Sequence, residues 1–223
     1  MKMSIIIPAY NEELAIKSTV ERVKSAVRGT DSEIIVIDDG SKDRTYEIAK
    51  SLSGIRLLHH EVNKGKAAAL ETGFSNASGN VLFTIDADCT YPPEVMPEVA
   101  ELMEKEGLDM VICSRFMGRK PQMSGLNYFG NLIFSALVTV LTLKRVTDAS
   151  SGLRALRKDV WKSMTVKSKG LDWEVEMTTR MLRGDFKVKE FPIQYFDRVG
   201  SSKLHPLRDG LRFLKAILIG RFF

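Results

Sequence analysis

Residues 81–88, Val-Leu-Phe-Thr-Ile-Asp-Ala-Asp, form the stretch from which the rest of the sequence is best interpreted. The apolar run predicts a strand covered on both faces, and it ends in two carboxylates, Asp86 and Asp88. Side chains two residues apart in extended chain point the same way, so both carboxylates can converge on one point. Asp-x-Asp triplets also occur by chance, but the position after a buried strand favours a site for Mg²⁺ or Mn²⁺ and a phosphate-bearing ligand.

Strands and helices alternate on both sides of this stretch. Short apolar runs predict further strands at residues 4–7, 34–37, 55–58 and 110–114, and apolar residues at helical spacing predict helices between them. The alternation predicts an α/β fold, a Rossmann-like single domain with a mostly parallel central sheet.

Polar residues follow four of the predicted strands, at what would be one edge of a parallel sheet. They are Pro8, Tyr10 and Glu12, then Asp38 and Asp39, then Asp86 and Asp88, and finally Arg115. Ligands of open α/β sheets bind outside the carboxyl ends of the strands. The sequence has neither a Gly-x-Gly-x-x-Gly nor a Walker motif, which favours a nucleotide bridged to carboxylates by a metal.

The second part of the chain has longer loops and a nearly uncharged run at residues 126–143. Asn, Ser and Thr side chains dilute that run, so it predicts a buried or interfacial helix rather than a membrane span. Polar loops are expected at residues 148–154 and 197–203, with a helix at 171–182 and a strand at 187–196. Arg198 and Lys203 are either solvated surface charges or groups that close on phosphate.

The basic charge of the chain is confined to its end. The net charge is +5, and residues 198–223 hold six Lys or Arg and one Asp, so the rest of the chain is neutral. A general nucleic-acid binder would spread its basic groups over a reading face, so that class is disfavoured. Residues 204–223 predict a basic amphipathic helix, with a leucine stripe at Leu204, Leu207, Leu211, Leu214 and Leu218 and with Arg208, Arg212 and Lys215 beside it. Such a helix lies either on an anionic membrane surface or docked on the protein.

The cellular compartment is predicted from the N-terminus and the cysteines. The first residues do not form a signal peptide, and Cys89 and Cys113 have neither metal-ligand nor disulfide spacing. We therefore expect a cytoplasmic protein that is peripherally associated with the cytoplasmic face of a membrane.

Several motifs together resemble family 2 glycosyltransferases, most closely the branch of dolichol-phosphate mannose synthases and dolichol-phosphate glucosyltransferases. The shared motifs lie at residues 7–12, 38–41, 86–88, 114–115, 148–154 and 197–203. The first motifs are common to the whole family, whereas Ser-Ser-Gly-Leu-Arg-Ala-Leu and Arg-Val-Gly-Ser-Ser-Lys are specific to the branch.

The resemblance implies a GT-A fold and an inverting sugar transfer. It assigns nucleotide-sugar contacts to Pro8, Tyr10, Glu12, Ile37, Asp39, Asp86, Ala87, Asp88, Thr90, Arg115, Ser150, Arg198 and Lys203. Asp86 and Asp88 would bind Mg²⁺ or Mn²⁺, and Asp88, Arg115, Arg198 and Lys203 would act in catalysis. It divides the chain into a GT-A domain at residues 1–203, with a nucleotide-binding half (1–115) and an acceptor-side half (116–203), followed by the C-terminal helix at 204–223.

The resemblance implies transfer from a nucleotide-diphosphate sugar to a polyprenyl or dolichyl phosphate at a membrane surface. GDP-mannose, UDP-glucose and UDP-GlcNAc remain candidate donors, because Thr90 departs from the mannose synthases and residues 63–66 look more like the glucosyl branch. A separate transmembrane subunit is a further candidate partner.

The acceptor decides whether the reaction needs a base. A lipid phosphate is largely ionised at neutral pH, with a second pKa of about 6. A hydroxyl acceptor on a glycan, lipid or protein would need a carboxylate base, for which Asp148, Asp172 and Glu174 are candidates. A nucleotidyltransferase and a non-catalytic nucleotide-sugar-binding membrane subunit are further alternatives.

Overall fold

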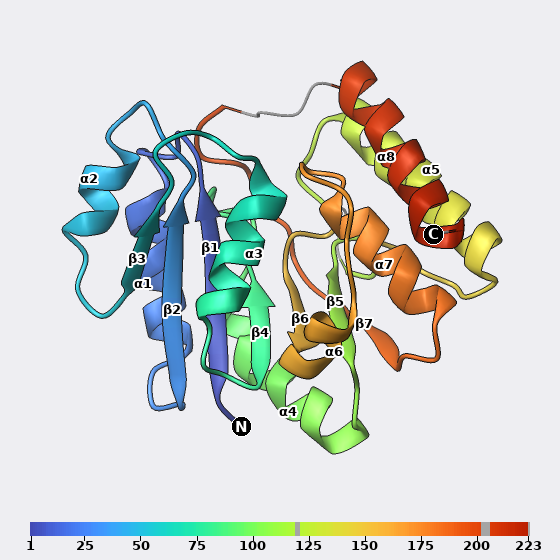
Figure 1. Cartoon of the computed structure of the whole chain (residues 1–223), viewed down its shortest axis with the longest axis horizontal. Helices are drawn as coiled ribbons and strands as arrows, with labels where there is room; N and C mark the ends of the chain where they lie inside the picture. Colours follow the sequence, from blue (N-terminus) through green and yellow to red (C-terminus); the bar gives the residue numbers. More distant parts are fainter. Residues whose placement is uncertain (119–120, 202–205, 223) are drawn as a thin grey trace.

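The computed structural model describes residues 1–118, 121–201 and 206–222, with the side chains of 206–209 left out. Within these residues the chain forms one seven-stranded sheet of order β3-β2-β1-β4-β6-β5-β7 (Figure 1). The strands are β1 Met3–Ala9, β2 Ser32–Asp38, β3 Arg56–His59, β4 Val81–Thr84, β5 Met110–Ser114, β6 Arg154–Arg157 and β7 Val188–Pro192. All neighbouring strands are parallel except β6, which runs antiparallel to both β4 and β5. The predicted α/β fold with a mostly parallel sheet is confirmed.

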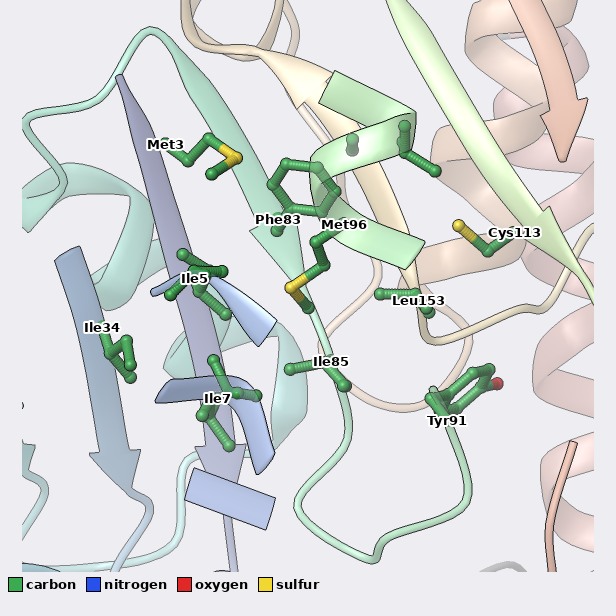
Figure 2. Packing of buried hydrophobic residues seen from close by; sticks show 14 of the residues in the cluster. Met3, Ile5, Ile7, Ile34, Phe83, Ile85, Tyr91, Met96, Cys113 and Leu153 are labelled. Carbon is green, nitrogen blue, oxygen red and sulfur yellow. The ribbon is translucent and has the colours of Figure 1, made fainter. Parts of the chain in front are cut away.

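Helices cover both faces of the sheet. They are α1 Ile16–Ala26, α2 Thr45–Lys50, α3 Lys66–Asn76, α4 Met96–Glu106, α5 Gly125–Thr142, α6 Lys158–Ser163, α7 Trp173–Arg183 and α8 Pro206–Phe222. Alternate residues of β1 pack against the helices on the two faces of the sheet, because successive side chains of a strand point in opposite directions. Ile5 and Ile7 pack with α1 and α4, whereas Ile6 packs with α3 and α7. Figure 2 shows Ile5 and Ile7 beside Phe83 and Ile85 in the first of these cores.

Three elements of the second part of the chain differ from the prediction. Strand β6 and helix α6 lie in a stretch for which no regular structure was predicted. Strand β7 ends at Pro192, so the predicted strand at 187–196 is too long. The residues after it form a loop whose backbone is tied to the loop that follows β4, since Phe196 N–H donates to the Thr90 carbonyl at 2.9 Å.

Helix α5 is exposed along much of its length. Only Ser135 and Val138 of this helix are buried, so of the two predicted alternatives the buried helix is wrong, and the interfacial helix stays a prediction. Its large exposed side chains are Leu126, Phe129, Ile133 and Val140. Among the described residues, α5 is the one helix long and apolar enough to cross a membrane by length and composition.

Helix α8 packs against α7 and α5 (Figure 1). Its buried side chains are Phe213, Ala216 and Ile217, and Phe213 meets Phe134 of α5 edge to face, with ring centroids 5.1 Å apart. The leucine stripe does not make this contact: Leu211, Leu214 and Leu218 are exposed. The helix is therefore docked on the protein through one face and carries an apolar stripe on another. Leu204 and the side chains of Leu207 and Arg208 lie outside the described structure.

Candidate functional site

A cavity of about 1180 Å³ lies outside the carboxyl ends of β1, β2, β4 and β5 and extends to α5, α7 and α8. Of the residues predicted from the sequence, it is lined by Pro8, Tyr10, Glu12, Asp39, Asp86, Ala87, Asp88, Arg115, Ser150 and Arg198. Ile37 and Thr90 are not among the lining residues: Ile37 lies in the core under α3, and Thr90 is buried behind Asp88. Lys203 lies outside the described residues.

Asp86 and Asp88 follow β4, and each faces a cation. Asp86 Oδ1 accepts a hydrogen bond from Lys66 Nζ at 2.5 Å, and Asp88 Oδ2 accepts one from Arg198 Nη1 at 2.6 Å. The other Asp88 oxygen accepts the Thr90 hydroxyl at 2.6 Å. Burial acts to raise the pKa of Asp86, but the charge and hydrogen bond of Lys66, together with the charges of Arg198 and Arg115, lower that pKa. Burial and the Asp86 charge raise the pKa of Asp88, so the two carboxylates differ in electrostatic environment.

Arg198 connects two parts of the cavity wall. Its guanidinium pairs with Glu12, at the end of β1, as well as with Asp88. The loop that carries it is held in place because Val199 N–H donates to the Asp88 carbonyl at 3.1 Å. Arg198 is therefore positioned beside the carboxylates rather than on the open surface.

Arg115 is held at the end of β5 by a carboxylate from the loop that precedes β6. Its Nε and Nη2 donate to the two oxygens of Asp148, each at 2.7 Å, and Nη2 also donates to Ser150 Oγ at 2.9 Å. Burial acts to lower the pKa of Arg115, but Asp148 raises it well above its usual value. Ser150 in turn donates to Asn131 of α5 at 2.5 Å. This chain of contacts joins the sheet edge to the start of α5.

At the opposite end of the cavity, Asp39 accepts several hydrogen bonds. His60 Nδ1 lies 2.7 Å from Asp39 Oδ1, and Lys64 N–H donates to the same oxygen at 3.0 Å. Gly65 N–H donates to Oδ2 at 2.8 Å. Gly65 adopts φ +93°, and a Cβ there would meet the Lys169 carbonyl oxygen, so glycine is required. The Asp39 carboxylate is thus fixed in orientation before any ligand binds.

The carboxylate oxygens of Asp86 and Asp88 are suitable ligands for a divalent cation. Carboxylate oxygens are the hard ligands that Mg²⁺ and Mn²⁺ prefer. No group of three or more His, Cys, Asp or Glu in the described part of the chain is arranged to hold a metal. An ion held here would therefore take its remaining ligands from a bound phosphate group or water.

Sequence reasoning missed Lys66 as a site residue. Its ammonium lies 2.5 Å from both Asp86 and Glu174, and the side chain is 15% exposed. A signal was present, because Lys66 is the first residue of α3 and a cation is unfavourable at a helix N-terminus. Tyr91 and Glu174 also line the cavity.

A mostly parallel sheet with paired carboxylates at a strand end and cations around them is typical of GT-A glycosyltransferases. The glycosyl transferase family 2 model matches residues 4–164. The chain belongs to this family.

Curated relatives agree with the branch predicted from the motifs. The dolichol-phosphate mannosyltransferase of Pyrococcus furiosus is 34% identical over 214 residues, which cover 92% of this chain and 59% of that protein. The dolichyl-phosphate hexose transferase of Haloferax volcanii is 32% identical over 217 residues, which cover 97% of this chain and 92% of that protein. The chain thus spans little more than half of the Pyrococcus relative.

Solved structures confirm the fold. Glucosyl-3-phosphoglycerate synthase from Mycobacterium tuberculosis, in complex with Mn²⁺, UDP and phosphoglyceric acid, superposes with a TM-score of 0.79 at 23% identity. The match covers 100% of this chain and 79% of that one.

Proposed function

We propose that this protein transfers a sugar, with inversion, from a nucleotide-diphosphate sugar to a polyprenyl or dolichyl phosphate at a membrane surface. The observation that carries the proposal is the extent of the cavity. One continuous cavity is lined by Asp86 and Asp88 at the sheet edge and by Phe134 and Phe213 of the two helices that expose apolar side chains. A polar donor and a lipid-linked acceptor could therefore meet in it.

The donor end suits a sugar diphosphate. Asp86 and Asp88 would hold Mg²⁺ or Mn²⁺, and a bound divalent ion would neutralise charge that develops on the diphosphate leaving group. The Mn²⁺ and UDP in the Mycobacterium tuberculosis structure support this assignment. Arg198, already beside Asp88, would contact the same phosphates, with Lys203 from the adjoining segment. GDP-mannose, UDP-glucose and UDP-GlcNAc all satisfy these contacts.

The acceptor end suits a phosphate nucleophile. In the reaction, an oxygen of the lipid phosphate bonds to the anomeric carbon while the bond from that carbon to the diphosphate oxygen breaks. No proton has to leave a largely ionised phosphate, whose second pKa is about 6. Arg115 lies at this end of the cavity and would offset repulsion between the two anions.

The carboxylates considered as bases support this acceptor over a hydroxyl group. Asp148 is bonded at both oxygens to Arg115, and Glu174 is ion-paired with Lys66. Asp172 accepts the Gly170 N–H at 3.1 Å. Asp148 and Glu174 are engaged by cations, and Asp172 is not among the described residues that line the cavity, whereas a hydroxyl acceptor would need one of them as a base.

The relatives' names and the exposed apolar side chains of α5 and α8 support membrane association. Apolar side chains sink into the headgroup boundary, and each nearby cation adds about 1 kcal/mol near an anionic surface. We infer contact with the cytoplasmic face, either directly or with a separate transmembrane subunit.

The reaction is tested by incubating the protein with each of the three nucleotide sugars and a polyprenyl phosphate in vesicles, with MgCl₂ or MnCl₂. We expect a new lipid that carries one sugar, identified by mass spectrometry. Transfer to glycan or alcohol acceptors without this lipid would support the hydroxyl-acceptor alternative. Nucleotide-sugar binding without turnover on any acceptor would support the non-catalytic alternative.

The membrane contact is tested by changing Leu211, Leu214 and Leu218 together to Glu. These side chains are exposed, so the fold should survive, and binding to anionic vesicles in a sedimentation assay should fall. Val62→Glu is the matched control, since Val62 is 64% exposed and Leu211 is 73% exposed. Equal vesicle binding by the triple variant and the wild type would contradict a membrane contact through α8.

A further inference from the structure

We propose that Tyr91 is an acceptor-binding residue, whose hydroxyl donates a hydrogen bond to the phosphate group of the acceptor. The inference rests on the proposed function, in that it assumes an acceptor that carries a phosphate. Tyr91 was not among the site residues predicted from the sequence. It adds a neutral donor to the cations that surround the cavity.

The side chain of Tyr91 joins the core to the cavity wall. Its ring packs in the same core as Ile85 and Leu153, and the side chain is 2% exposed. Tyr91 also lines the cavity, and Figure 2 shows its hydroxyl pointing away from Ile85. Tyrosine has an apolar body and a polar tip, so the ring can serve the core while the hydroxyl serves a ligand.

Only one hydrogen bond among the described residues involves the Tyr91 hydroxyl. Gly152 N–H donates to the Tyr91 oxygen at 2.7 Å. A Cβ at Gly152 would lie 2.5 Å from Asp86 Oδ2, so glycine lets this loop come close to the carboxylate. Because the oxygen accepts the amide, its own O–H remains a donor for which the described residues provide no acceptor. A buried donor without a partner is costly, which points to a ligand.

The hydroxyl keeps its proton at neutral pH. Burial raises the pKa of Tyr91 well above its usual value, although the positive charge of Arg115 acts to lower it. Tyr91 is therefore a neutral donor with a cation nearby, rather than a further charge in the cavity.

A second unpaired donor belongs to the same cluster. The rings of Tyr91 and Tyr195 meet edge to face, with centroids 5.1 Å apart, and the Arg115 guanidinium carbon lies 5.3 Å from the centroid of the Tyr195 ring. Asp148 and Ser150 engage Nε and Nη2 of Arg115, whereas Nη1 makes no hydrogen bond with the described residues. A phosphate group has several acceptor oxygens and can satisfy both donors.

The loop at residues 148–153 favours the acceptor phosphate over the donor diphosphate. This loop carries Asp148 and Ser150, which hold Arg115, and it also carries the Gly152 amide that holds the Tyr91 hydroxyl. The Arg198 guanidinium, assigned above to the diphosphate, is held by other residues. The two sources of phosphate share one chemistry, so the experiment has a separate arm for each.

Tyr91→Phe removes the hydroxyl and keeps the ring. Titration calorimetry of the full chain measures binding of geranyl phosphate, a soluble prenyl phosphate, and separately of UDP and GDP with MnCl₂. Geranyl phosphate should bind about tenfold or more weakly to the variant, the scale of one hydrogen bond to a charged group, with nucleotide affinity unchanged. A loss confined to the nucleotides would assign the hydroxyl to the donor diphosphate and overturn the proposal.

Ser151→Ala is the matched control for loosening the loop. Its hydroxyl donates to the Cys113 carbonyl at 2.6 Å, and Ser151 is not among the described residues that line the cavity. Both variants remove one hydrogen bond that holds the loop, so urea denaturation should show a loss of stability in each. Only Tyr91→Phe should lose affinity for geranyl phosphate, and an equal loss in the two variants would overturn the contact.

The same titrations separate this inference from the proposed function. If the wild type and Tyr91→Phe bind geranyl phosphate equally, the role of Tyr91 is refuted and the proposed function stands. If the wild type binds no prenyl phosphate, both are refuted.

Discussion

Replacing Lys66 by Met should destabilise the protein far more than the same change at a surface lysine. Met has a similar length but no charge, so Asp86 and Glu174 would lose the ammonium that lies 2.5 Å from each. Glu174 is 3% exposed and would become a buried charge without a cation, whereas Asp86 is 29% exposed and keeps some hydration. Removing one partner of a buried pair costs about 3–5 kcal/mol, and the partial exposure of Asp86 favours the lower figure.

Lys189→Met is the matched control. Lys189 pairs with Glu106 at 2.6 Å, nearly the same separation, but the two side chains are 45% and 38% exposed. Exposed pairs contribute about 0–1 kcal/mol, so only burial distinguishes the two variants. The free energy of unfolding is measured by urea denaturation, where a loss of about 3 kcal/mol should move the midpoint by roughly 1 M or more.

A second substitution separates the lost charge from lost packing. Glu174→Gln in the Lys66→Met background removes the stranded carboxylate, so the double variant should recover part of the lost stability. Equal losses for Lys66→Met and Lys189→Met would refute this reasoning. A double variant less stable than Lys66→Met would show that the effect is one of packing.

Three further predictions concern catalysis, pH and packing. Asp88→Ala should lower sugar transfer by orders of magnitude with an unchanged circular dichroism spectrum, and full turnover of this variant in EDTA would contradict the role of Asp88. Arg198→Ala should cost about 3 kcal/mol in kcat/KM, and unchanged kinetics would contradict the role of Arg198. Burial acts to raise the pKa of Glu33, but hydrogen bonds from two serines lower it to about 2. The ionised Glu33 side chain therefore stabilises the folded protein at pH values above its unfolded pKa, and this stabilisation is lost as the pH falls toward 2. Glu33→Gln should therefore be about 1 kcal/mol less stable at pH 7, with the gap closing in acid; a constant gap would contradict the assignment. Gly220→Val should weaken docking of α8 by about 1–3 kcal/mol, because a Cβ there would lie 2.8 Å from α7. The variant should be cleaved faster than the wild type in limited proteolysis, and an unchanged cleavage rate would contradict this prediction.

The strands and helices whose apolar residues form a continuous run or recur at a regular spacing could be predicted from the sequence. The strands around residues 81–88 are buried on both faces, and their apolar runs identify them without tertiary information. Strand β6 was missed because it begins and ends with arginine. Arg154 is fully buried, but its guanidinium donates to the Ser151, Ala149 and Glu174 carbonyls, which sequence spacing does not reveal.

For the candidate site, strand-end residues could be placed and their partners could not. The carboxyl edge of a parallel sheet brings Asp39, Asp86 and Arg115 together wherever the loops go. Lys66 and His60 come from loops and helix starts, and their roles depend on contacts across the fold. For α8, the leucine stripe was visible in the sequence, but the docked face, Phe213, Ala216 and Ile217, was not, because both faces are apolar.

The reversed direction of β6 has a consequence for how related proteins can diversify. A strand that runs against its neighbours begins at the edge where they end, so the loop at residues 148–153 enters the sheet between the strand that leads to Asp86 and the strand that leads to Arg115 (Figure 1). Neighbouring strands are held about 4.8 Å apart by their hydrogen bonds, whatever chain connects them. We therefore expect the connection between β5 and β6, which includes α5, to tolerate changes in length and sequence during evolution while the distance between the ends of β4 and β5 stays constant.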